Sequence, residues 1–268
     1  GISAGFSAVF GTPFTGAIFA LEIMGLRNIR WQSILPSFIA AFAAHYICLQ
    51  WNTTHIDYHF TMDWYWTLKN ILLVIASGIF FGITALVFSN ANKLLKPVIT
   101  IIPKLWIRGT LGGLLILILY HLFPMSDYMG LGINGIINAF QHTTAWYVFV
   151  IKLLLTVFTL SVGFKGGEVT PLFFIGATMS SLLILFIPLP LSILAAMGLV
   201  AVFAGATHTV VASIVLGYEM YGWSTGNIVA IAVIIAYFTS GEQGIYESQH
   251  KTGAKYALYN YIKEIIKL

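Results

Sequence analysis

Long apolar blocks alternate with short polar segments along the whole chain. A membrane-spanning helix needs about 17–25 mainly apolar residues, and seven blocks reach this length once their flanks are counted. The blocks are Ser37–Leu49, Leu68–Ser89, Gly109–Phe123, Trp146–Phe164, Leu172–Pro188, Ile193–Ala206 and Ile228–Phe238. None alternates with period two, as the strands of a membrane barrel do, and helices are therefore predicted. The pattern indicates an all-α polytopic (multi-pass) membrane protein.

Composition and charge support this class. Hydrophobic residues make up 59% of the 268 residues and charged residues only 8%, whereas a soluble domain carries about a quarter charged residues. The net charge of +4 comes from clusters around Arg27, Arg30, Lys93–Arg108 and Lys251–Lys267. Such clusters are typical of cytoplasmic loops that follow the positive-inside bias. We therefore expect a lipid bilayer as partner and no nucleic acid.

Metal and enzyme sites find little support in the sequence. The single cysteine, Cys48, excludes a CxxC metal site and a disulfide framework. His55 and His59, with Asp57 between them, are the only plausible metal pair, and their spacing in a polar loop argues against one. No G-x-S-x-G, H-E-x-x-H or P-loop motif is present. We expect no metal, no cofactor and no enzyme activity.

An internal repeat with an offset of 197 residues relates the two ends of the chain. Residues 1–25 align with residues 198–222, and the two acidic residues Glu22 and Glu219 fall in the same register. The other identical pairs are Gly1/Gly198, Ala4/Ala201, Phe6/Phe203, Thr12/Thr209 and Gly25/Gly222. Repeated halves, often inverted, are the architecture of many secondary transporters. The repeat therefore favours transport.

The repeat also divides the chain into four regions. Residues 1–25 are expected to be the helix pair that ends the first repeat, and residues 26–142 the connecting helices and loops. Residues 143–250 form the second repeat, and residues 251–268, which mix lysine with tyrosine, read as an interfacial amphipathic helix. The polar segments 52–63, 90–104 and 124–142 are interpreted as joints between spans.

Ser161–Pro171 is the strongest candidate for a functional loop. Its three glycines break an apolar helix, and Pro171 suits the first turn of the next. The break leaves unpaired N–H groups at the positive end of a helix dipole, which is an arrangement that binds anions. Glu168 lies within this break, and an ionisable residue at membrane depth indicates function. The alternative is a glycine hinge in which Glu168 pairs with Lys165.

The motifs resemble those of the CLC family of anion channels and transporters. Gly1–Glu22 matches the pattern G-x-x-A-G-x-x-A-x-F-x-x-P-x-x-G-x-x-F-x-x-E, and Gly166–Pro171 takes the place of the family's G-x-F-x-P anion loop. The string G-G-E-V-T-P is similar to the fluoride branch, with Val169 where phenylalanine is usual. Tyr246 matches the tyrosine before the family's last helix.

This resemblance implies a CLC-like inverted-repeat helical bundle with broken helices at the anion site. The implied activity is secondary active export of fluoride in exchange for protons, in the plasma (inner) membrane, by a homodimer with one pathway per subunit. The implied anion-binding residues are Gly166, Gly167, Glu168, Val169, Thr170 and Tyr246. We expect Thr170 and Tyr246 to donate hydrogen bonds to fluoride, a strong acceptor.

Glu168 is expected to couple protons to the anion. A carboxyl group in a dry site beside an anion favours its protonated form, which then donates a hydrogen bond, and losing that proton links the two ions. Glu22 is followed by Ile23, where chloride-branch exchangers resembling this segment carry a second acid. Glu22 and Glu219 are interpreted as buried carboxylates that accept structural hydrogen bonds.

Two other functions stay open at this point. A CLC-type chloride channel or chloride/proton exchanger is the first alternative, and the loop that discriminates it would lie about 30 residues before Gly1, by analogy with the spacing in the second repeat. A non-transporting membrane protein or intramembrane enzyme is less favoured, because no catalytic pair is visible. The dimer contacts are expected on Pro13–Met24, Leu35–Leu49, Val210–Tyr221 and Ile228–Phe238.

Overall fold

The computed structural model describes residues 1–23, 31–51, 55, 64–123, 125–246 and 254–266, and each regular element in these ranges is a helix. The all-α prediction is confirmed. The α-helices are α1 (Ile2–Phe10), α2 (Pro13–Glu22), α3 (Trp31–Gln50), α4 (Leu68–Ile99), α5 (Leu105–Leu122), α6 (Ile133–Gln141), α7 (Val148–Ser161), α8 (Val169–Leu183), α9 (Leu191–Thr207), α10 (Val210–Thr239) and α11 (Ala254–Ile266). A short 3₁₀ helix, η2, spans Ser126–Tyr128.

Each predicted apolar block falls on a helix. In the described part of the chain, α3, α4, α5 and α10 are long and apolar enough to cross a membrane. The helices α7, α8 and α9 are apolar but shorter. Helix α10 joins two predicted segments across a kink at Gly222, whose backbone (φ 72°, ψ −177°) is not helical.

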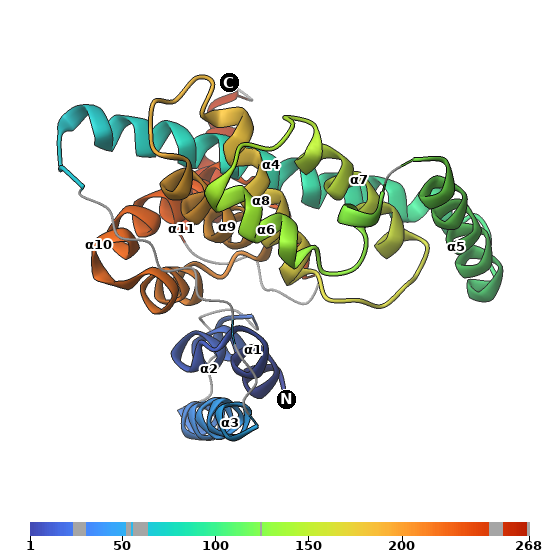
Figure 1. The fold of residues 1–268 in the computed structure, drawn as a ribbon, viewed down its shortest axis with the longest axis horizontal. Coiled ribbons are helices and arrows are strands. Elements are labelled where there is room, and N and C mark those ends of the chain that lie inside the picture. Colours follow the sequence, from blue (N-terminus) through green and yellow to red (C-terminus); the bar gives the residue numbers. More distant parts are fainter. Residues whose placement is uncertain (24–30, 52–54, 56–63, 124, 247–253, 267–268) are drawn as a thin grey trace.

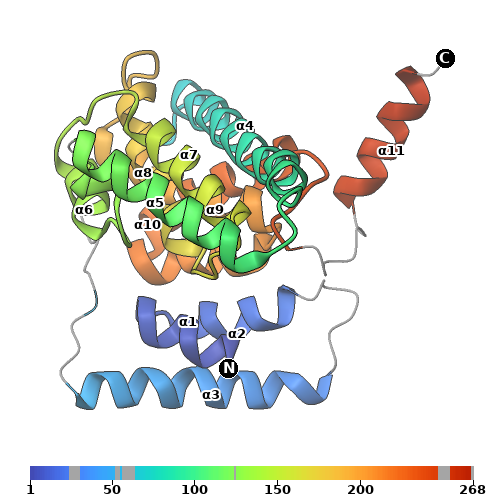
Figure 2. The ribbon, with the colours of Figure 1, turned by 90° about the vertical axis from the view of Figure 1, so that its right-hand side faces the viewer.

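The helices are arranged in layers around α8 and α9. Figures 1 and 2 show α3 as an outer layer, with α1 and α2 between it and the rest of the bundle. Helix α9 is buried throughout residues 193–207. It crosses α8 so closely that a Cβ atom on Gly176 or Gly198 would collide with the backbone of the other glycine. The core of the fold therefore depends on two glycines facing each other.

Two predicted joints are wrong in part. Residues 90–104 were expected to interrupt the helices, but α4 continues to Ile99, because Pro97 lies in its last turn and removes only one helical hydrogen bond. Residues 124–142 were expected to be turns, but they contain η2 and α6. Helix α6 forms because Ile136 and Ala139 bury one face against the core.

Several expectations fall outside the described residues. They include Asp57 and His59, so only His55 of the histidine pair, against which the sequence argued as a metal site, is described. In the described ranges, no three potential metal ligands lie together.

The two helix pairs that the sequence repeat relates share one turn geometry. Helix α1 ends at Gly11, and helix α9 ends at the equivalent residue, His208; both have left-handed backbones (φ 71° and 55°). Thr12 and Thr209 then precede α2 and α10 with nearly the same dihedral angles, −116° and 82° against −109° and 78°. The same turn therefore joins both pairs.

The two repeat-related acids join the repeats reciprocally. Glu22, at the end of α2, accepts hydrogen bonds from the N–H groups of Val211 (3.0 Å) and Ala212 (2.7 Å) at the start of α10. Glu219, in α10, accepts hydrogen bonds from Phe14 (2.9 Å) and Thr15 (2.7 Å) at the start of α2. Each carboxylate satisfies N–H groups that a helix leaves unpaired. The expected structural role of both acids is confirmed, and α2 and the first part of α10 run antiparallel.

Candidate functional site

A break between α7 and α8 forms the candidate site. Helix α7 ends at Ser161, and the chain does not become helical again until Val169. Gly163 makes the turn possible, because its backbone is left-handed (φ 101°) and a Cβ atom there would lie 2.5 Å from Leu105. Glu168 is the N-cap residue of α8, yet its carboxylate makes no capping hydrogen bond with that helix. The carboxylate is thus available to the cavity in front of the helix.

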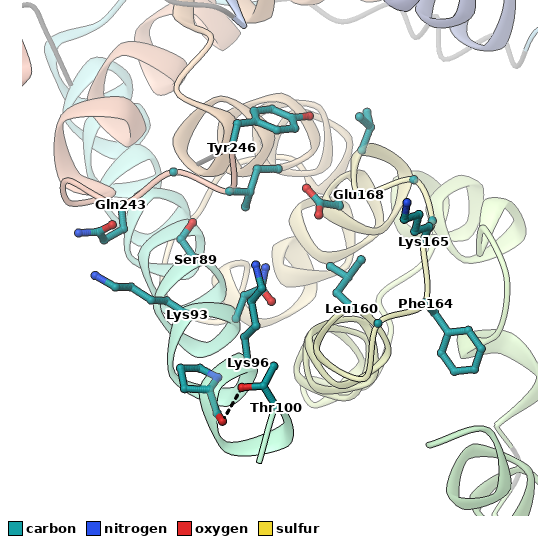
Figure 3. A pocket seen from close by; sticks show the side chains of 18 of the residues that line it. Ser89, Lys93, Lys96, Thr100, Leu160, Phe164, Lys165, Glu168, Gln243 and Tyr246 are labelled. Atoms are coloured by element: carbon teal, nitrogen blue, oxygen red, sulfur yellow. Dashed lines mark hydrogen bonds between the residues drawn. The ribbon is translucent and has the colours of Figure 1, made fainter. Parts of the chain in front are cut away.

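A cavity of about 1300 Å³ opens in front of this helix end (Figure 3). We call it the α4–α8 cavity. Its walls are residues 163–169, one face of α4, residues 242–246 after α10, and Tyr256 of α11. Figure 3 shows the Glu168 carboxylate pointing into it. The predicted residues Gly166, Gly167, Glu168, Val169 and Tyr246 all line this cavity. The site residues therefore come together from two distant parts of the sequence.

Thr170 differs from the other predicted site residues. It is the second residue of α8 and does not belong to the cavity lining, although its neighbour Val169 does. The sequence could not show which of Val169 and Thr170 lines the cavity. Neighbouring residues of a helix point in different directions, and the packing of the helix decides which direction faces the cavity.

Tyr246 is held over the cavity by contacts with two other helices. Gly241 starts its segment with a left-handed turn (φ 75°), and the N–H of Ile245 donates to the carbonyl of Ala206 in α9 (2.9 Å). The Tyr246 ring then packs edge-on against Phe19 of α2, with 6.4 Å between ring centroids. Tyr246 is close enough to Glu168 for the two groups to interact electrostatically. In Figure 3 its hydroxyl points toward the side of the cavity where Glu168 lies.

Helix α4 contributes a polar wall that sequence reasoning missed. Ser89, Lys93, Lys96 and Thr100 follow one another at helical spacing and all line the cavity (Figure 3). The charge that acts on Glu168 is that of Lys96, a residue of another helix, and not that of Lys165, the partner in the alternative hinge interpretation. The signal was present in the sequence, as polar residues on one face of an apolar helix, but it fell in a segment interpreted as a loop.

This arrangement suits a small anion. The first N–H groups of α8, the Tyr246 hydroxyl and the Lys96 ammonium group offer donors or positive charge toward one cavity, and Glu168 provides a group that can bind and release a proton. Nothing in it resembles a nucleophile with an activating base.

Comparisons with known proteins identify the family of this chain. The sequence profile described as "Voltage gated chloride channel" matches residues 1–241. A protein of Pseudomonas syringae pv. tomato named "Chloride/fluoride channel protein" is 40% identical over 266 residues, which is 96% of this chain and 58% of that protein.

Solved structures give the same result for the fold. A CLC-type fluoride/proton antiporter superposes with a TM-score of 0.88 at 32% identity, covering 93% of this chain and 64% of that protein. A slow cyanobacterial Cl⁻/H⁺ antiporter has a TM-score of 0.75 at 20% identity, with 91% and 61% covered, and shows the fold alone. The chain thus spans 58–64% of the length of these relatives. Because the profile covers most of its residues, the chain belongs to the voltage-gated chloride channel (CLC) family.

Proposed function

We propose that this chain forms the second-repeat anion site of a fluoride/proton antiporter that carries fluoride out of the cell in exchange for protons. One observation carries the proposal: Glu168, at the broken start of α8, lies in the same cavity as the Tyr246 hydroxyl. The printed descriptions of two relatives, a chloride/fluoride channel protein and a fluoride/proton antiporter, support the choice of ions.

Fluoride fits the donors around this cavity. It is small and strongly hydrated, so leaving water is costly unless protein donors replace the lost contacts. The N–H groups that open α8 and the Tyr246 hydroxyl supply such donors, and Lys96 supplies positive charge. We propose Gly166, Gly167, Glu168, Val169, Thr170 and Tyr246 as the anion-binding set, with Thr170 contributing least because it does not line the cavity.

Glu168 is the proton-coupling residue in this proposal. A protonated carboxyl group donates to fluoride, whereas the carboxylate repels it, so anion and proton occupancy favour each other. Lys96 acts in the opposite sense, because its charge stabilises the carboxylate. Burial of Glu168 favours the protonated carboxyl group, and the charge of Lys96 favours the carboxylate. The balance of these two effects decides when Glu168 releases its proton.

Glu168→Gln tests the assignment in the full-length protein reconstituted into vesicles. Glutamine keeps the size and a donor but fixes the charge at neutral. We expect proton-coupled fluoride flux to be abolished or uncoupled. Asp127→Asn is the control, because Asp127 is an exposed acid of η2 that does not line this cavity, and its coupled flux should stay that of the wild type. Exchange of both ions at the wild-type ratio in Glu168→Gln would remove Glu168 from the mechanism.

A chloride channel or chloride/proton exchanger is the second candidate, favoured by the names of the relatives. The same vesicles separate the three functions. A fluoride antiporter takes up protons as fluoride leaves and does so poorly with chloride, a chloride exchanger prefers chloride, and a channel moves the anion with no proton uptake.

The chain is a multi-pass membrane protein, and we propose the plasma (inner) membrane and a homodimer. The dimer would use the apolar faces of α2, α3 and α10. Helix α3 exposes Leu35, Ile39 and Tyr46, whose relative exposures are 67%, 60% and 63%. Since apolar side chains associate in lipid by packing alone, this face suits a second copy of the protein.

A further inference from the structure

Lys255 lies in the first turn of α11 and is completely buried, although its side chain is long and ends in an ionisable ammonium group. Its ammonium nitrogen lies 2.8 Å from Nε2 of His208 and donates to the Ser240 hydroxyl at 2.9 Å. It also lies 4.5 Å from the ring centroid of Tyr237. A buried lysine without a carboxylate in contact is costly. Lys255 therefore depends on a histidine, a hydroxyl and an aromatic face.

His208 adds a second unusual feature to this cluster. It is the one described residue other than glycine with a positive φ (55°). The equivalent residue of the first repeat is Gly11, which adopts this backbone without strain. A residue with a Cβ atom is strained in the left-handed region, and such strain is found mostly at functional sites. The second repeat thus keeps an imidazole where the first uses glycine.

Tyr256 connects His208 to the α4–α8 cavity. Its hydroxyl lies 2.9 Å from Nδ1 of His208, and Tyr256 lines the cavity that Glu168 and Tyr246 also line. Hydrogen bonds therefore run without interruption from the cavity wall through Tyr256 and both nitrogens of His208 to Lys255.

We propose that Lys255, His208 and Tyr256 form a proton-storage site that exchanges one proton with the α4–α8 cavity. The proposal rests on the proton-coupled function given above, for which Glu168 is the partner in the same cavity. In this proposal the three residues bind a proton, and they do not bind the anion.

The transfer balances without a further reactant. Lys255 gives a proton to Nε2 of His208, Nδ1 of His208 gives its proton to the Tyr256 oxygen, and Tyr256 releases its own proton into the cavity. Lys255 becomes a neutral amine, His208 stays neutral in its other tautomer, and Tyr256 stays neutral. The reverse sequence reloads the site from the cavity, so one entrance is enough.

The charged and titratable groups around the cluster are compatible with this exchange. Burial lowers the pKa of Lys255 to about 7, and Glu242 opposes that shift only in part. Burial raises the pKa of Tyr256 to about 12, so it passes a proton without becoming an anion at neutral pH. The groups that face the cluster are Tyr237 and Ser240 of α10, Glu242 and Lys263, and Glu22, whose charge acts on Tyr237.

Glu242 is the acid whose charge acts on Lys255, but its ion pair is with another lysine. Glu242 forms a bidentate ion pair with Lys263, both oxygens lying 2.7 Å from the ammonium nitrogen. A purely structural lysine at this position would need acceptors such as His208 and Ser240, but not a further hydrogen bond that links His208 to the cavity. The chain of bonds through His208 accordingly points to proton exchange.

The test measures fluoride efflux and proton uptake together, in vesicles that contain the full-length protein, from pH 5.5 to 9. We expect the wild-type rate to change steeply around pH 7. Lys255→Gln should remove this inflection and lower proton uptake below pH 7 by about tenfold or more, as expected when a positioned proton donor is lost. Lys104→Gln is the control, because Lys104 is exposed before α5 and lies outside both the cavity lining and the cluster, and its profile should stay that of the wild type.

Two further variants separate proton storage from a structural role. Tyr256→Phe leaves the contacts of Lys255 in place and removes only the link to the cavity. His208→Asn keeps a residue that tolerates a left-handed backbone but does not titrate. Both should lose the inflection while the protein stays folded. A wild-type pH profile in folded Tyr256→Phe and His208→Asn overturns the proposal. Absence of coupled flux in the wild type overturns the antiporter function itself, and the storage site with it.

Discussion

Replacing Glu219 by glutamine tests the contacts that hold the two repeats together. The carboxylate accepts the N–H groups of Phe14 and Thr15 at 2.9 and 2.7 Å, and the Thr15 hydroxyl at 2.6 Å. Glutamine has the same shape but only one acceptor oxygen. If that oxygen faces Thr15, the new NH₂ group must face the N–H of Phe14, so two donors meet.

The size of the effect follows from these bonds. One hydrogen bond to a charged group contributes about 1.5–3 kcal/mol, and a negative charge at a helix N-terminus adds about 0.3–1 kcal/mol. We therefore expect Glu219→Gln to lower the free energy of unfolding by about 2–4 kcal/mol. Denaturant unfolding of the purified protein in detergent micelles, followed by circular dichroism, measures this change.

A double-mutant cycle of Glu219→Ala with Thr15→Val isolates the side-chain bond. The coupling between the two changes should be about 1.5 kcal/mol, because either change alone removes the hydrogen bond from the Thr15 hydroxyl to the carboxylate. Glu242→Gln is the control, since its partner Lys263 is exposed and surface ion pairs contribute about 0–1 kcal/mol. If Glu219→Gln changes stability by no more than this control, the reciprocal caps do not join the repeats as we argue.

Further predictions concern the site, the core, the dimer and α11. Tyr246→Phe should weaken fluoride binding about tenfold, measured by isothermal titration calorimetry, because it removes one donor to a charged acceptor; Thr170→Val should have a smaller effect, since Thr170 does not line the cavity. Gly176→Ala should prevent folding, seen as loss of a monodisperse peak in size-exclusion chromatography, because its Cβ would collide with the backbone of α9. A photo-crosslinker at Ile39 should join two copies of the protein, and labelling of lipid alone would contradict the proposed dimer face. Since the pKa of Lys255 falls to about 7 on folding, the unfolded state binds more protons between pH 7 and 10, so protection of α11 from hydrogen exchange should rise over that range.

Much of this protein was predictable from local pattern. The apolar blocks located the spans, since lipid allows only helices or closed barrels and the blocks lack the period-two alternation of barrel strands. The glycines around Gly163 and the acid at Glu168 located the helix break, because the chain can only turn there through residues with the required backbone freedom. The 197-residue offset paired Glu22 with Glu219 and so anticipated that the two helix pairs share one geometry.

Contacts between distant segments were decided by the tertiary structure alone. Which cation acts on Glu168 could not be predicted from the sequence, because Lys165 is near in the chain whereas Lys96, whose charge acts on Glu168, belongs to another helix. Equally, no local pattern indicates that Lys255 of the last helix is buried against His208. The sequence by itself therefore determined the elements, the break and the repeat, which depend on residues close together in the chain. Only packing decided which side chains face the cavity, because that depends on how whole helices cross.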